Sequence, residues 1–222
     1  MQRQHAMARR ALLACGILST ALYASLDVIS GLRYDGYSFA SRAVSELSAV
    51  GAPTRSLWTA WGPVYQILVI LFGCGVWASA GGKRALRIVS GLLVTFGLFG
   101  FSWAFFPMHQ REVLAAAGPA ITDTMHKILS LVTVVFLLSI IGFGAAAGGK
   151  RFRLYSIATI VLLGVFGALT GQDAPRIEAN LPTPWVGVTE RLIVYAPMLW
   201  FAALVIALWK RSEALTARMG IQ

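Results

Sequence analysis

Residues 122–133 read TDTMHKILSLVT and begin a long apolar stretch that continues to residue 147. Asp123, His126, Ser130 and Thr133 are spaced three or four residues apart, so a helix places them on one side. Ionisable groups at the end of a membrane helix are costly unless they face a bundle interior, a cavity or a partner. The stretch therefore predicts a membrane-spanning helix whose polar stripe points inward.

The whole composition agrees with a membrane protein. Hydrophobic residues make up 57% of the 222 residues, charged residues make up 13%, and the mean hydropathy is +0.70. A membrane span needs about 20 mostly apolar residues. The sequence contains six such stretches, at residues 11–31, 58–80, 86–106, 125–147, 154–170 and 188–209. We therefore expect an all-α, polytopic bundle of six transmembrane helices that forms a single membrane domain over residues 1–222.

The basic residues predict the orientation of this bundle. Most of the 19 Lys and Arg fall on the side that would hold both termini. They are Arg3, Arg9, Arg10, Lys83, Arg84, Arg87, Lys150, Arg151, Arg153, Lys210, Arg211 and Arg218. By the positive-inside rule, both termini are cytoplasmic in a protein of the cell inner membrane. The charge is expected to contact anionic membrane lipids, and no nucleic-acid-binding motif accompanies it.

The acidic residues fall at the other end of the predicted spans. Eight of the nine Asp and Glu lie at or near the outer face: Asp27, Asp35, Glu46, Glu112, Asp123, Asp173, Glu178 and Glu190. His109 and His126 lie there too. Because acids contribute little to topology, orientation does not explain this clustering, which places any chemistry at the outer face.

The first outer loop contains a second amphipathic pattern. Phe39, Ala40, Val44, Leu47 and Val50 recur at helical spacing, and serines and Arg42 occupy another face. The pattern predicts a short amphipathic helix over about residues 38–50, which either caps the bundle as a surface helix or covers a site as a lid.

Short motifs in this loop and in the last span resemble a known family. SELSAVGAPT at residues 45–54 follows the first span, and GVTER at residues 187–191 opens the last one. With the Asp-x-x-His helix between them, this order resembles the domain-of-unknown-function 998 family of prokaryotic multi-pass membrane proteins. The sequence is more remotely similar to the Frag1/DRAM group, which has Ile-Ser-Asp where this chain has Val44-Ser45-Glu46. That remote resemblance implies a link to lipid remodelling.

Three chemistries fit the candidate polar residues. A metal hydrolase would use His109, His126 and Asp123 to hold a divalent metal such as zinc, with Asp27 or Glu46 beside it. A metal-free site would use Ser45, His126 and a carboxylate in acid–base or nucleophilic catalysis. A small-solute or proton transporter would use Asp27 and the Asp123–His126 stripe.

Two further candidates open the final helix. Glu190 has a favourable position in the dipole of that helix, and Arg191 is expected to pair with an outer carboxylate or to hold a substrate. A non-catalytic bundle, tied together by such pairs, is the fourth interpretation. The sequence thus predicts an outward-facing polar pocket capped by the Ser45–Glu46 loop, which would act on a lipid or small-molecule substrate if the protein is a hydrolase-like lipid-processing enzyme.

Overall fold

The computed structural model describes residues 2–218, which fold into helices joined by short loops. The long helices are α1 (Gln2–Arg33), α2 (Arg55–Ala78), α3 (Arg84–Gly100), α5 (Ile121–Ala147), α6 (Lys150–Glu178) and α7 (Val186–Arg218). The short elements are the 3-10 helices η1 (Val44–Ser48) and η2 (Phe101–Ala104) and the helix α4 (Arg111–Ala117). Six helices are long and apolar enough to cross a membrane, which confirms the predicted fold class.

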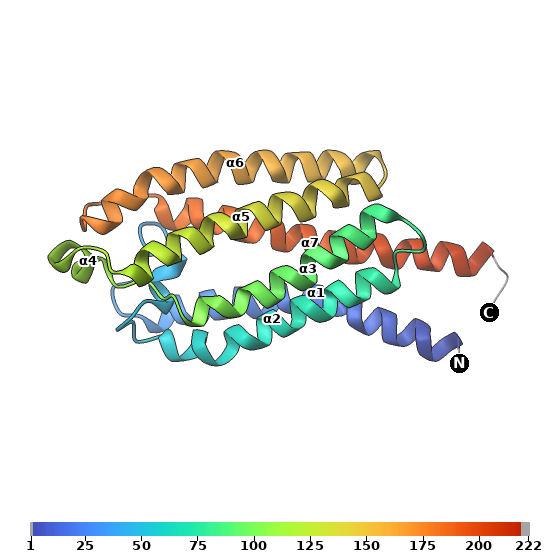
Figure 1. Cartoon of the computed structure of the whole chain (residues 1–222), viewed down its shortest axis with the longest axis horizontal. Coiled ribbons are helices and arrows are strands. Elements are labelled where there is room, and N and C mark those ends of the chain that lie inside the picture. The colour runs from blue at the N-terminus through green and yellow to red at the C-terminus, as the bar shows by residue number, and fades with distance from the viewer. Residues whose placement is uncertain (1, 219–222) are drawn as a thin grey trace.

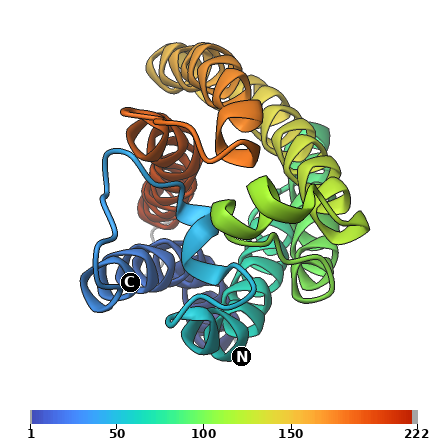
Figure 2. The same ribbon diagram turned by 90° about the vertical axis from the view of Figure 1, so that its left-hand side faces the viewer.

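The six long helices form a closed ring. Each packs against the next in the order α1, α2, α3, α5, α6 and α7, and α7 returns to α1. Figure 2 shows this ring from one end, with η1 and α4 lying across its mouth. The ring leaves an interior that side chains from every long helix can reach.

The two ends of the bundle differ in character. The first residues of α1 and the last of α7 lie at the same end as the α2–α3 and α5–α6 turns (Figure 1). We call this the terminal end, and it carries the basic residues of the positive-inside pattern. The opposite end, called the loop end, holds η1, η2 and α4. The acidic and histidine residues predicted to share one face therefore do gather at one end of the bundle.

Glycines let α1, α2 and α3 pack tightly against one another on one side of the ring. A Cβ on Gly75 would meet the backbone of Leu12 and Leu13, and one on Gly97 would meet Ile70 and the carbonyl of Gln66. Small residues at such crossings let membrane helices pack by van der Waals contact. Deeper in the bundle the core is apolar, with Val69, Phe72 and Trp200 all 0% exposed.

The predicted amphipathic helix over residues 38–50 is wrong in extent, because only Val44–Ser48 is helical, as the 3-10 helix η1. Of the preceding backbone, the Arg42 amide still donates to the Ser38 carbonyl at 2.9 Å, but other groups bond to α7 or to a side chain. The Phe39 carbonyl accepts from Arg191, the Ala40 carbonyl accepts from the Gly187 amide, and the Ala43 amide donates to Glu46. In this segment, hydrogen bonds to α7 and to side chains thus take the place of most backbone bonds of a helix. We call residues 34–54 the cap segment.

The fifth span is also longer than predicted, since α6 continues beyond residue 170 to Glu178. The sequence there is polar and contains Pro175, which favours a loop. The helix persists because Ile177 packs into an apolar cluster at the loop end with Ala43, Met108 and Leu114. This cluster joins the cap segment, α4 and α6 into one lid over the ring.

Candidate functional site

A pocket of about 370 Å³ lies inside the ring at the loop end. All six long helices and η1 contribute to its lining. On α2, α5 and α7 the lining covers residues 55–66, 126–137 and 190–201, about three helical turns or roughly 16 Å each. The pocket is therefore a shaft that enters the bundle from beneath the cap segment.

The lining changes character along this depth. Its loop end presents polar side chains, namely Ser45, Ser48, Arg55, His126 and Glu190. Its deeper part is formed by Phe96, Leu137, Met198 and Phe201. One turn further along α2, α5 and α7 lie Val69, Ile140 and Val205, all 0% exposed. The pocket is thus polar above, mainly apolar below, where Gln66 is a polar exception, and closed by the core.

Three buried polar atoms of the lining have no hydrogen-bond partner among the described residues. They are Trp58 Nε1, Gln66 Oε1 and Thr133 Oγ1. Buried polar groups in folded proteins are almost always hydrogen-bonded, and each such exception calls for an explanation. The three residues line the pocket, so a small rotation of their side chains would offer one donor, one acceptor and one hydroxyl to a molecule inside it.

His126 lies on the pocket wall with one ring nitrogen engaged. Its Nδ1 is 3.0 Å from the Phe106 carbonyl oxygen, and the Trp103 ring packs edge-on against the imidazole at 4.9 Å. A carbonyl oxygen only accepts, so Nδ1 carries the proton of the neutral ring and Nε2 carries the lone pair. Because no described residue is hydrogen-bonded to Nε2, it is available as a base.

Glu190 also lines the pocket and holds the start of η1. Its Oε2 accepts a hydrogen bond from the Val44 amide at 2.6 Å, and its Oε1 accepts one from the Ser45 amide at 3.4 Å. A carboxylate at a helix N-terminus satisfies amides that lack partners within the helix. Glu190 therefore explains why η1 starts where it does, and it brings Ser45 to the pocket.

Arg191 ties the cap segment to α1 and α7. It donates to both carboxylate oxygens of Asp27, at 2.7 and 2.9 Å, and to the Phe39 carbonyl at 2.8 Å. It also donates to the Tyr37 hydroxyl at 2.9 Å, and the Tyr195 hydroxyl donates to Asp27 at 2.5 Å. Arg191 thus pairs with a carboxylate of the loop end, as expected from the sequence.

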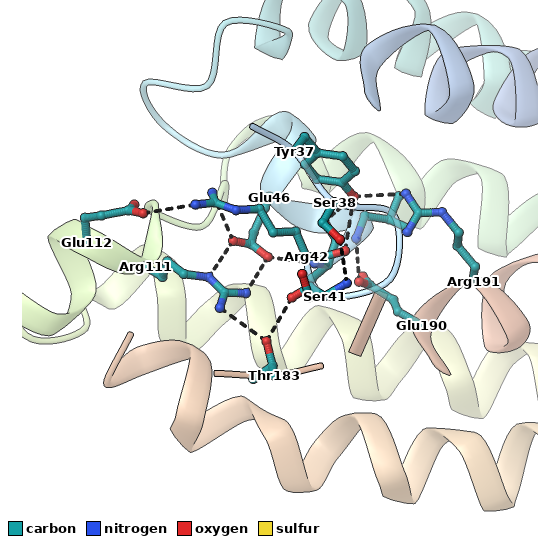
Figure 3. A network of polar contacts seen from close by, with 12 residues as sticks. Tyr37, Ser38, Ser41, Arg42, Glu46, Arg111, Glu112, Thr183, Glu190 and Arg191 are labelled. Carbon is teal, nitrogen blue, oxygen red and sulfur yellow. Dashed lines mark hydrogen bonds and ion pairs between the residues drawn. The ribbon is translucent and has the colours of Figure 1, made fainter. Parts of the chain in front are cut away.

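Tyr37 completes this network in the cap segment. Burial raises the pKa of its hydroxyl, although the Arg191 guanidinium acts in the opposite direction. The hydroxyl therefore keeps its proton and donates to the carbonyls of Ala43 and Arg42, at 2.9 and 3.2 Å. The path from Arg191 through Tyr37 to η1 is visible in Figure 3.

Glu46 is occupied by a second buried pair. Arg111 Nε and Nη2 donate to its two oxygens at 2.7 and 2.8 Å, and the Ala43 amide donates at 2.6 Å (Figure 3). Burial alone would lower the pKa of Arg111, but the hydrogen bonds and charge of Glu46 more than offset it and hold that pKa above its usual value. Arg111 also reaches Thr183, which donates to the Ser41 carbonyl. Glu46 thus fixes the lid rather than lining the pocket.

The third pair joins His109 and Asp123. The Asp123 carboxylate accepts from the His109 amide at 2.7 Å and from the Ala120 amide at 2.8 Å, and it lies 2.9 Å from His109 Nδ1. Asp123 therefore caps the start of α5 and anchors the loop before α4. It does not line the pocket, whereas His126, Ser130 and Thr133 of the predicted stripe do.

The structure thus divides the predicted site residues into two groups. Ser45, His126 and Glu190 meet at the pocket. The others form the surrounding pairs Asp27–Arg191, Glu46–Arg111 and His109–Asp123. Within residues 2–218, no three His, Cys, Asp or Glu side chains form a group that could hold a metal ion. Of the predicted ligands, His109 and Asp123 pair with each other, but neither His126 nor Asp27 joins them in a group of three.

Sequence reasoning missed three pocket residues. Trp58 is readily mistaken for a residue of the aromatic belt, and Arg55 for a loop charge. Gln66 did carry a signal, because it is a single polar residue within a long apolar run. A Cβ on Gly100 of α3 would overlap the Gln66 side chain. The glycine therefore gives Gln66 the room to enter the pocket.

These features define an α-helical, multi-pass membrane protein with a pocket at one end of its helical ring. The model of the family described as "Protein of unknown function (DUF998)" matches residues 17–207, and the chain belongs to this family. The match includes both motifs, SELSAVGAPT and GVTER. Comparison with curated proteins and with solved structures gives no match.

The structure gives GVTER a physical role. Gly187 passes against the cap segment, and its amide donates to the Ala40 carbonyl at 2.9 Å. Glu190 and Arg191 then bind η1 and the Asp27–Phe39 region. The motif is therefore the docking point for the cap segment on α7.

Replacing Gly187 with alanine is expected to lower the melting temperature of the detergent-solubilised protein by about 5 °C. The new Cβ would overlap the carbonyl oxygens of Phe39 and Arg42, which are backbone atoms and cannot rotate away. Gly164→Ala in α6 is the control, since a Cβ there meets nothing within 4 Å. Equal melting temperatures for Gly187→Ala and Gly164→Ala would contradict this role.

Asp123 and His126 are expected to respond differently to alanine substitution. Asp123→Ala removes the acceptor of three groups and should cost about 2–4 kcal/mol, a fall in melting temperature on the order of 8 °C. His126→Ala removes one hydrogen bond to Phe106 and the packing against Trp103, and it should change the melting temperature by less than about 3 °C. Thermal unfolding of both variants tests this, and equal losses would argue against the division between pocket and anchoring residues.

Proposed function

We propose that the protein binds a lipid-like amphiphile in this pocket at the outer face of the membrane. The observation that carries the proposal is the unpartnered set Trp58 Nε1, Gln66 Oε1 and Thr133 Oγ1 within a shaft that is polar above and apolar below. An amphiphile with its polar group beneath η1 and its apolar part toward Leu137 and Phe201 matches that gradient. A volume of about 370 Å³ falls within the usual range of ligand pockets, roughly 300–1,000 Å³.

The proposal includes the orientation, with both termini cytoplasmic and the loop end outside. The basic residues of the terminal end support it through the positive-inside rule. In this orientation the polar end of the pocket lies at the depth of the outer head groups. A lipid of the outer leaflet has its head group at this depth and its acyl chains toward the membrane centre. This is the same order as the polar and apolar parts of the pocket.

Processing of the bound lipid is the second candidate, as in a hydrolase-like enzyme. The free Nε2 of His126 supports it, because a general base needs an available lone pair facing its substrate. Ser45 and Glu190 would supply a hydroxyl and a carboxylate on the same wall. The transporter alternative has less support, since the pocket ends above the buried residues Val69, Ile140 and Val205.

Lipid analysis of the purified protein tests the proposal. Protein extracted in a mild detergent should carry about one lipid molecule per chain by native mass spectrometry. Thr133→Phe fills the pocket from α5 and should reduce the bound fraction about tenfold. Val135→Phe is the matched control, because Val135 is on the same helix, is 56% exposed and does not line the pocket.

The outcomes separate the alternatives. Lipid bound to wild type and Val135→Phe but lost from Thr133→Phe supports a pocket ligand. Lipid that stays bound to all three occupies the outer surface of the ring, which contradicts the proposal. Absence of lipid from all three leaves the non-catalytic, membrane-organising interpretation.

A further inference from the structure

Two opposite charges lie at the two ends of η1, and both line the pocket. Glu190 accepts hydrogen bonds from the amides of Val44 and Ser45 at the start of η1. Arg55 Nη1 donates to the Ser48 carbonyl at the end of η1, at 3.5 Å. The pocket therefore presents an anion at one side of its polar end and a cation at the other.

Neither charge has an opposite partner of its own. Among the described residues, no ion pair within 4.0 Å involves Glu190 or Arg55. The other charged side chains around the pocket are all paired, in Asp27–Arg191, Glu46–Arg111 and His109–Asp123. Because buried or half-buried charges are normally compensated, the two that remain point to a ligand that brings both signs.

The spacing of the two charges suits a zwitterion. η1 has five residues, and a 3-10 helix rises about 2.0 Å per residue, so its ends are roughly 8 Å apart. The two side chains are thus too far apart to neutralise each other by direct contact. A ligand with its own anion and cation a few bonds apart can contact both at once.

We propose that the pocket selects a zwitterionic phospholipid head group, with its phosphate at Arg55 and its ammonium at Glu190. The inference rests on the proposed function, since it specifies the ligand of the same pocket. Arginine suits phosphate because its planar fork donates two parallel hydrogen bonds. Trp58 Nε1 lies one helical turn from Arg55 and supplies a further donor to the phosphate.

The acceptors for the ammonium are also present. A primary ammonium has three N–H donors and no acceptor. The Glu190 carboxylate and the Nε2 lone pair of His126 both line the polar end of the pocket. A purely anionic head group would fit Arg55, and its hydroxyls could donate to Glu190, but it would bring no positive charge to that carboxylate.

Competition between lipids with matched acyl chains tests the selection. The probes are phosphatidylethanolamine, which is zwitterionic, and phosphatidylglycerol, which is anionic. The full-length wild-type protein in detergent should bind the first at least about tenfold more tightly in native mass spectrometry. Free phosphorylethanolamine separates a lipid from a soluble head group as the source, and it should compete at least about a hundredfold less well, because it leaves the apolar shaft empty.

Variants assign the preference to the two charges. Glu190→Gln keeps an acceptor for the Val44 amide and should abolish the preference while phosphatidylglycerol still binds. Arg55→Gln should weaken both lipids about tenfold. Glu112→Gln and Arg33→Gln are the controls, since neither residue lines the pocket, and both should behave as wild type.

The failures are distinguishable. Equal binding of the two lipids by the wild-type protein overturns the zwitterion inference and leaves lipid binding intact. An unchanged preference in a folded Glu190→Gln variant overturns it as well. If that variant does not fold, the wild-type preference alone decides. Binding of neither lipid removes the proposed function itself, and tighter binding of free phosphorylethanolamine than of either lipid identifies a soluble ligand instead.

Discussion

Replacing Arg191 with glutamine is expected to lower the melting temperature by on the order of 10 °C, one of the two largest effects proposed for this protein. Among the described residues, the change leaves Asp27, which is 1% exposed, with the Tyr195 hydroxyl as its only side-chain partner. Removing one member of a buried ion pair costs about 3–5 kcal/mol because the remaining charge stays buried without compensation. The same change frees the Phe39 carbonyl and Tyr37, so the cap segment loses its anchor on α7.

Two further variants test this explanation. Arg191→Lys keeps the charge but cannot serve both Asp27 oxygens and the Phe39 carbonyl, so its loss should be intermediate. The double variant Asp27→Asn with Arg191→Gln removes both charges and should be more stable than Arg191→Gln alone. A double variant as unstable as the single one would mean that the anchoring of the cap segment, not the stranded charge, dominates.

An exposed ion pair provides the control for both. Lys127 and Glu178 lie 2.6 Å apart, with side chains 48% and 30% exposed. Lys127→Gln should cost less than about 1 kcal/mol because solvent screens such pairs. A loss of stability comparable with that of Arg191→Gln would show that burial does not determine how much stability is lost when an ion pair is broken.

Helix-level features were predictable from the sequence because they depend on local patterns. Runs of apolar residues located six spans, and the spacing of His126, Ser130 and Thr133 located a stripe that does line the pocket. The inward direction of Asp27 followed from the cost of a charge within the membrane, and Asp27 is 1% exposed. These inferences need only the period of a helix and the properties of hydrocarbon.

Which polar residues line the pocket and which are paired was not predictable. Asp27 and Arg191 are 164 positions apart, and Glu46 and Arg111 are 65 apart, so no local spacing joins them. Asp123 and His126 are adjacent on the stripe, yet Asp123 turns back to cap α5. The predicted metal site depended on such side chains being free, and the pairs occupy most of them.

The prediction of a helix over the cap segment was wrong for a related reason. Its amphipathic pattern is real, because Val44 and Leu47 are buried, but the pattern does not say where the backbone groups find their partners. Arg191 and Gly187, which are remote in the chain, and the nearby Glu46 side chain provide those partners. Local periodicity predicts which side faces inward more reliably than it predicts the type of backbone.

Glu46→Gln is expected to cause the second large loss of stability, and a larger one than Arg111→Gln. If Arg111 is removed, Glu46 retains Arg42, whose guanidinium lies 3.7 Å away. In Glu46→Gln, Arg111 keeps the amide oxygen and Thr183 as acceptors but loses its one ion-pair partner among the described residues, while its side chain is 7% exposed. Arginine does not lose its proton at accessible pH, so it cannot escape the cost of burial by becoming neutral.

The expected magnitudes follow from this asymmetry. Glu46→Gln should cost about 3–5 kcal/mol, or on the order of 10 °C in melting temperature, and Arg111→Gln roughly half of that. Thermal unfolding of the two variants, beside the exposed control Glu112→Gln, measures the difference. Equal losses, or a greater loss for Arg111→Gln, would contradict the view that Arg42 is a second partner for Glu46.

The same substitution links the lid to the pocket. Glu46 holds the Ala43 amide immediately before η1, and Glu190 holds the two amides that follow. Glutamine has one acceptor oxygen where the carboxylate has two, so the Ala43 amide and Arg111 would compete for it. The weakened contact should let η1 shift and so displace Ser45 and Ser48 from the polar end of the pocket. Glu46→Gln should therefore also reduce the bound lipid, whereas Asp123→Ala, which lowers stability without touching η1, should leave the folded fraction fully loaded. Lipid content per folded chain in these two variants separates a lid that shapes the pocket from one that only stabilises the bundle.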